Sequence, residues 1–90
     1  MTFDELTVGD LVTYTCSNDP DDTASLILEI ERSDNRRCRI TLFLVSNDDS
    51  FVMTVIRRLD DKIPVWLDEN ETCRVFRQGE VILEETRCPL

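Results

Sequence analysis

The sequence of 90 residues predicts a small all-β domain, either a meander barrel or a strongly bent antiparallel sheet of five to seven strands. Short runs rich in β-branched and aromatic residues recur along the chain, and clusters of Asp, Asn and Ser separate them. Within the runs, apolar and polar residues alternate, as in strands with one buried face. With 41% hydrophobic residues, the chain can bury one core. We therefore expect residues 1–90 to form a single domain.

The N-terminal third of the chain should begin with a helical turn and continue as two strands. Thr2 and Glu5 have the spacing of a capping box, which predicts a single helical turn there. The first strand is expected at Leu11–Cys16, and the second at Ser25–Arg32. Between them, Ser17–Thr23 is polar and contains a proline, so we expect a loop.

The remaining strands should extend the sheet through three hairpins with short turns. They are expected at Arg37–Val45, Phe51–Arg57, Thr72–Arg77 and Glu80–Glu84. The hairpin turns are expected at 33–36, 46–49 and 78–79, because Asp, Asn and Gly tolerate the required backbone angles. Consecutive hairpins place strands that are neighbours in sequence side by side.

The segment Lys62–Leu67 is apolar but contains Pro64, which cannot lie in a central strand. It is expected as an edge strand or as a packed crossover. Trp66, the single tryptophan, has two interpretations. The residues favour a core plug at one end of the barrel, and the alternative is an exposed anchor for a protein partner.

Phe43 lies on the strand face opposite Leu42 and Leu44, so this strand should be covered on both sides. Either the last hairpin folds over it, or a second subunit does. A homodimer is therefore one of the expectations for this chain.

The stretch Val8-Gly9-Asp10-Leu11-Val12 is a Gly-Asp turn that runs into the first strand. It resembles the opening of small SH3-like β-barrels, which continue as a meander of about five strands. Their second strand often starts with glycine, where this chain has Ser25. The resemblance implies a fold only, because such barrels include adaptors, RNA-binding proteins and virion parts.

The net charge of the chain limits the classes of partner that it can bind. The 19 Asp and Glu residues exceed the 10 Lys and Arg residues, which gives a net charge of −9, and histidine is absent. This balance disfavours direct binding to nucleic acid or to anionic membranes, and it favours a basic protein surface. The acidic start and the lack of a long apolar run predict neither a signal peptide nor a membrane span, so a cytoplasmic location is expected.

The four cysteines lack the close spacing of a zinc knuckle, so we expect no metal site. Cys38 and Cys73 alternate with polar residues inside predicted strands and should be small buried hydrophobes. Cys16 and Cys88 lie near segment ends and should be the more exposed pair. Free, bridged and metal-bound states remain open from the sequence.

Catalysis finds little support. A serine or cysteine nucleophile generally needs a neighbouring base, and the chain has no histidine. Adjacent carboxylates in a strand point to opposite faces, so the acidic doublets do not form an acid–base pair. We expect a protein that is not an enzyme and takes no cofactor.

These observations predict a non-enzymatic module whose acidic surface engages a basic surface of a larger protein, as do inhibitors or adaptors encoded by viruses and mobile elements. The candidate partner-binding residues are Asp48, Asp49, Asp60, Asp61, Trp66, Asp68, Glu69 and Glu71.

Two alternatives remain. One is a structural subunit of a virion or multi-subunit assembly, and the other is an SH3-like RNA-binding module. The RNA alternative depends on five arginines, namely Arg36, Arg37, Arg39, Arg57 and Arg58. It requires them to converge on one face free of Glu29 and Glu31, whereas antiparallel pairing predicts neutralised cross-strand pairs.

Overall fold

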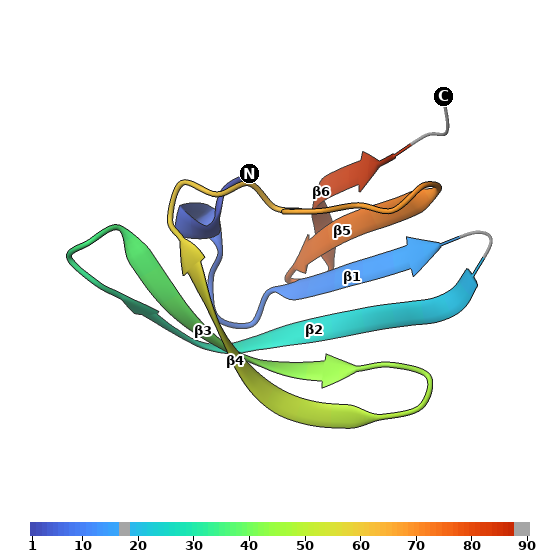
Figure 1. The fold of residues 1–90 in the computed structure, drawn as a ribbon, viewed down its shortest axis with the longest axis horizontal. Coiled ribbons are helices and arrows are strands. Elements are labelled where there is room, and N and C mark those ends of the chain that lie inside the picture. The colour runs from blue at the N-terminus through green and yellow to red at the C-terminus, as the bar shows by residue number, and fades with distance from the viewer. Residues whose placement is uncertain (17–18, 88–90) are drawn as a thin grey trace.

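The computed structural model describes residues 1–16 and 19–87 of the chain. These residues form one six-stranded antiparallel sheet with the strand order β4-β3-β2-β1-β5-β6 (Figure 1). The elements are the 3₁₀ turn η1 (Phe3–Glu5), β1 (Leu11–Cys16), β2 (Asp19–Arg32), β3 (Arg37–Val45), β4 (Ser50–Arg58), β5 (Glu71–Arg77) and β6 (Glu80–Thr86). The all-β prediction is confirmed.

The sheet is bent and open. Strands β1 to β4 follow one another as hairpins, and then the crossover of residues 59–70 carries the chain back to β1, where β5 pairs with it. Within the described residues, β4 and β6 each pair with one strand only, so the sheet does not close into a barrel. The bent sheet, and not the barrel, is therefore the alternative that this sequence adopts.

The strand positions agree with the sequence pattern, with one correction. The loop prediction for 17–23 is wrong for residues 19–23, which belong to β2. Thr23 pairs with Tyr14 and Asp19 pairs with Cys16, so the β1–β2 hairpin continues almost to its tip. Pairing of β2 with β3 ends at Ala24, and positions with a strand on one side only tolerate proline. Residues 17 and 18 lie outside the described residues.

The hairpin turns use residues with left-handed backbone angles. Arg36 has a φ of 61° in the β2–β3 turn, and Gln78 and Gly79 have φ values of 52° and 81° in the β5–β6 turn. Consecutive positive φ angles are typical of tight hairpin turns, and they match the twist of the flanking strands. The predicted turn at 78–79 is thus confirmed.

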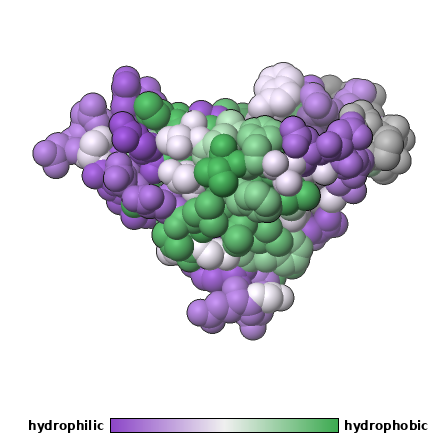
Figure 2. Space-filling model, turned by 90° about the horizontal axis from the view of Figure 1, so that it is seen from below, coloured by the Kyte–Doolittle hydropathy of each residue, from purple (hydrophilic) through white to green (hydrophobic). Residues whose placement is uncertain are grey.

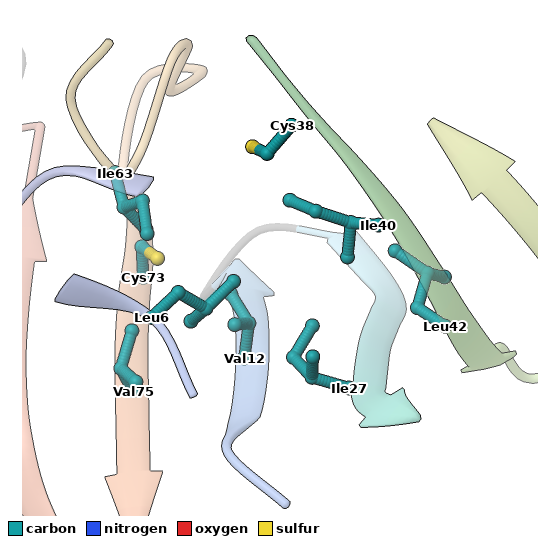
Figure 3. Packing of buried hydrophobic residues seen from close by; sticks show 9 residues of the cluster. All are labelled: Leu6, Val12, Ile27, Cys38, Ile40, Leu42, Ile63, Cys73 and Val75. Atoms are coloured by element: carbon teal, nitrogen blue, oxygen red, sulfur yellow. The ribbon is translucent and has the colours of Figure 1, made fainter. Parts of the chain in front are cut away.

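The core lies on the inner face of the sheet, which two segments cover. Leu6, after η1, and Ile63, in the crossover, bury their side chains against strand residues. Figure 3 shows the cluster, whose members are Leu6, Val12, Ile27, Cys38, Ile40, Leu42, Ile63, Cys73 and Val75. The burial predicted for Cys38 and Cys73 is confirmed. Cys16 is half-buried, and Cys88 lies outside the described residues.

An ion pair between a buried carboxylate and a partly exposed arginine joins the residue before β1 to the end of β5. Asp10 is 1% exposed, and Arg77 donates to both of its carboxylate oxygens at 3.0 and 2.9 Å. The backbone N–H and hydroxyl of Thr7 donate to the same carboxylate at 2.9 and 3.0 Å. Burial alone would raise the pKa of Asp10, but the hydrogen bonds from Arg77 and Thr7 outweigh it and lower the pKa below its ordinary value. The preceding Gly9 supplies the φ of 92° that this turn needs.

Within residues 1–16 and 19–87, no segment covers the outer face of the sheet in this way. One prediction for Phe43 was that the last hairpin folds over it, and this is wrong, because β5 and β6 extend the same sheet beyond β1. Phe43 pairs with Leu26 on one side and Val52 on the other, on a face that no other described segment crosses. Figure 2 shows a continuous hydrophobic area on the side of the molecule opposite the crossover.

Candidate binding site

The candidate site is built on the crossover of residues 59–70, which the N-terminal segment holds in place. Ile63 donates its backbone N–H to the carbonyl of Met1 at 3.0 Å, and Phe3 donates to the carbonyl of Asp61 at 3.1 Å. Asp4 donates to the carbonyl of Leu59 at 3.0 Å. Three backbone bonds and one buried isoleucine therefore fix the first half of the crossover over the sheet. The prediction of a packed crossover, with Pro64 outside the strands, is confirmed.

After this anchor the chain turns outward and presents Trp66. Its side chain is 68% exposed, so the interpretation as a core plug is wrong. The indole Nε1 donates to Asp68 Oδ1 at 3.1 Å, and the Arg87 guanidinium lies 5.6 Å from the ring centroid. These polar partners hold the ring outside the core. Ile63, and not Trp66, is the residue of this segment that packs into the core.

The surroundings of Trp66 are themselves braced. Arg87 donates to the carbonyl of Leu67 at 3.0 Å, and the backbone N–H of Asp68 donates to Glu71 Oε1 at 3.1 Å. We call Trp66, Asp68, Glu71 and Arg87 the Trp66 platform. An exposed aromatic ring that is fixed from two sides loses little conformational entropy on binding, which is the property of an anchor residue.

Beside the platform, an apolar cleft of about 370 Å³ opens between the crossover and the inner face of the sheet. Val65 and Trp66 form its rim, and the 60% exposed Val65 lies next to the ring in sequence. Its walls come from the N-terminal segment, β1, β2, β3 and β4, mainly through aliphatic side chains. The cleft therefore lies over the inner face of β1 to β4, on the side that the crossover covers in part.

Three polar side chains, Tyr14, Ser25 and Arg57, line this cleft. Burial raises the pKa of the Tyr14 phenol and raises that of the Cys73 thiol, its cross-strand neighbour, to about 11. Both groups therefore stay neutral at physiological pH. Arg57 donates to the carbonyl of Ile56 at 2.9 Å, and no carboxylate of the described residues forms an ion pair with it. The cleft thus carries one positive charge and no described nucleophile that is ionised.

The structure brings some of the predicted site residues together and separates others. Asp68 and Glu71 join Trp66, and the exposed Glu69 lies between them in sequence, with its carbonyl 3.7 Å from the Cys16 sulfur. The predicted doublets Asp48-Asp49 and Asp60-Asp61 lie at opposite ends of β4. A strand of nine residues separates these doublets by a distance on the order of 30 Å.

Within these doublets, the polar contacts are local. Asp49 accepts the N–H of Ser50 at 2.8 Å, and Asp61 accepts the N–H of Arg58 at 3.2 Å. Asp60 forms an ion pair of 3.8 Å with Arg58. The carboxylates of Asp49 and Asp61 thus shape their own turns, and only Asp60 and Asp61 lie on the crossover that carries the Trp66 platform.

The arginines of the RNA alternative are divided between the two faces of the sheet, and two of them pair with carboxylates. Arg39 pairs across the strands with Glu31 at 3.7 Å, as antiparallel pairing predicts. Arg58 is engaged by Asp60, while Arg57 lies in the cleft on the inner side. The arrangement neutralises two of the five arginines and points a third away from the others.

Sequence reasoning missed two features. The Asp10–Arg77 pair joins residues 67 positions apart, and no local pattern signals it. The cleft also went unpredicted, although Pro64 at the start of an apolar run indicated a segment that packs on the sheet without joining it.

No family model, curated protein or solved structure matches this chain. Within residues 1–16 and 19–87, no helix is long and apolar enough to cross a membrane. Over the same part of the chain, no cluster of three or more His, Cys, Asp or Glu side chains could hold a metal ion.

Proposed function

We propose that this chain is a non-enzymatic protein-binding module that holds a segment of a larger partner at the Trp66 platform and the adjoining cleft. The partner segment carries an apolar side chain that enters the cleft and a basic side chain that meets Asp68 and Glu69. The observation that carries the proposal is Trp66 itself, which is exposed and yet fixed by Asp68 and Arg87.

The charge around the platform supports a basic partner. Residues 60–71 carry five carboxylates and one lysine, which makes this stretch strongly acidic. Acidic groups at the rim of an interface attract a basic partner and speed its association, while the apolar centre supplies most of the affinity. The cleft beside Trp66 offers such a centre.

The test is a pull-down from lysate of the native host with matched baits, with captured proteins quantified by mass spectrometry. The first pair of baits compares Asp68→Asn with Glu69→Gln against Asp48→Asn with Asp49→Asn. Each bait loses two negative charges, but only the first loses them beside Trp66. The proposal expects the first bait to lose most of the captured partner and the second to retain it.

A third bait, Trp66→Ala, tests the apolar anchor. We expect the amount of captured partner to fall at least about tenfold, since truncating an anchor residue costs about 1.4 kcal/mol or more of binding free energy. Equal capture by wild type and by Trp66→Ala would reject the site. Capture that depends on Trp66 but resists high salt would reject the role of the carboxylates.

Two further expectations stay proposals. The Gly9 turn that runs into β1 and the meander of β1 to β4 support placing the fold in the small SH3-like class. The alternative function, a structural subunit of an assembly, is favoured by the uncovered outer face of the sheet. A bait that loses its partner only when the outer face is altered would support that alternative.

A further inference from the structure

The outer face of the sheet carries a row of apolar side chains, one from each strand. Strand pairing aligns each member with the next, from edge to edge of the sheet. The row, which we call the belt, consists of Val52, Phe43, Leu26, Leu11, Phe76 and Val81. It runs perpendicular to the strands and crosses all six of them.

Further apolar residues widen the belt. Val45 lies on the same face, next to Phe43 along β3, whereas Ile56 lies farther along β4 beyond Thr54. Leu28 and Ile82 are the extra residues of bulges in β2 and β6, and both are exposed. A bulge sets two residues against one, which adds an apolar side chain where a regular strand would have none.

The area of this face is large for an uncovered surface. The exposed parts of the belt and of Val45, Leu28 and Ile82 amount to an apolar area on the order of 600 Å², at the upper end of what a monomer shows. A standard protein interface takes about 800 Å² from each partner, so the belt with its polar margin supplies the area of one half. No described segment of the chain covers it.

The order of the belt points to the occupant. Read across the sheet, the side chains are Val, Phe, Leu, Leu, Phe and Val, the same series from either end. A two-fold axis that lies in the interface along the strands reverses the belt, and it therefore sets Val52 on Val81, Phe43 on Phe76 and Leu26 on Leu11. An interface between identical copies must be self-complementary in this way.

The charges at the margins also suit a second copy. Although the chain has a net charge of −9, the margins of the belt carry ion pairs, Arg39 with Glu31 at 3.7 Å and Arg74 with Glu84 at 2.8 Å. The acidic stretch of residues 60–71 follows β4 and crosses the covered side of the sheet. Two copies can thus meet belt to belt without bringing these acidic stretches together.

We infer that the outer face is a homodimer interface in which two copies pack their sheets face to face, belt on belt. The two sheets form the middle of this dimer, and the covering segments of each copy form its two outer layers. Both Trp66 platforms therefore remain open to partners. This inference rests on the outer face alone and is independent of the function proposed for Trp66.

The test is sedimentation velocity over a concentration series up to about 100 µM, with a matched pair of variants. Val52→Asp places a charge in the belt at a residue that is 59% exposed, and Val65→Asp makes the same change at one that is 60% exposed beside the cleft. We expect wild type and Val65→Asp to sediment as a dimer, with twice the chain mass of 10.5 kDa. We expect Val52→Asp to raise the dissociation constant at least about tenfold.

Val81→Asp, at the other end of the belt, should behave as Val52→Asp does, and circular dichroism confirms that each variant is folded. A monomeric wild type over the whole series overturns the inference, as does a Val52→Asp protein that remains dimeric. Loss of the dimer in Val65→Asp also overturns it. Partner capture that fails with Val65→Asp while the dimer persists separates this interface from the Trp66 site.

Discussion

The two faces of this sheet come from the same strands, and they differ in what lies over them. On the inner face, alternate residues such as Ile40 and Val75 are buried beneath the N-terminal segment and the crossover. On the outer face, the intervening residues include apolar side chains such as Val52 and Ile56, which remain exposed. Alternation thus decides which side chains share a face, and the covering segments decide which face becomes the core.

The largest effect that would break this comparison is a loss of core volume on one face only. Ile40→Ala should lower the free energy of unfolding by about 2–5 kcal/mol, because it leaves a cavity in the buried cluster. Ile56→Ala is the same change on the exposed face of the neighbouring strand, and we expect less than about 0.5 kcal/mol. Urea unfolding at low protein concentration measures both, and equal losses would show that the faces do not differ.

The ion pair of Asp10 and Arg77 belongs to the inner half of the comparison. Asp10→Asn should lower the free energy of unfolding by about 3 kcal/mol. This is the lower end for breaking a buried ion pair, because Arg77 is partly exposed and can be hydrated. The folded-state pKa of Asp10 is lowered, so the ionised carboxylate stabilises the fold above about pH 4. As the pH falls through the folded-state pKa, protonation removes this contribution.

The stability difference between wild type and Asp10→Asn should therefore shrink on acidification below about pH 4. Chemical unfolding at a series of pH values measures this difference. A difference that stays constant, or that grows as the pH falls, would show that the carboxylate owes its role to shape and not to charge.

The smallest expected effect sharpens the contrast between covering the core and facing a partner. Trp66→Ala removes a ring that contacts Arg87 and Asp68 outside the core, so we expect a loss of at most about 1 kcal/mol. Thermal unfolding measures it beside Ile63→Ala, which empties a buried position in the same crossover. If Trp66→Ala lowers stability as much as Ile63→Ala does, the ring contributes to the core, and its interpretation as an exposed anchor is wrong.

The strands could be predicted because their signals are local. Alternation and turn residues located β1, β3 and the 78–79 turn at the positions that the structure shows. The path after β4 could not be predicted, because pairing of β5 with β1 depends on residues about 60 positions apart. The prediction that Trp66 is buried failed for a related reason, since Ile63, three residues earlier, occupies the core position of that segment.

The site was predicted in part. Trp66, Asp68 and Glu71 form one cluster, whereas Asp48-Asp49 is separated from it by the length of β4. Composition marks carboxylates as candidates but contains no information on which end of a strand they occupy. The belt was visible in the sequence only as Phe43, because its other members align through strand register.

The pairing of β1 with β5 has a consequence for how the protein is made. The ribosome releases the chain from its N-terminus, so Asp10 emerges long before Arg77, its counterion. Until β5 has been synthesised, β1 lacks one neighbouring strand and the carboxylate of Asp10 lacks its partner. The hairpins of β1 to β4 can form before β5 emerges, but the complete sheet must wait for β5 and β6, since contacts distant in sequence form late.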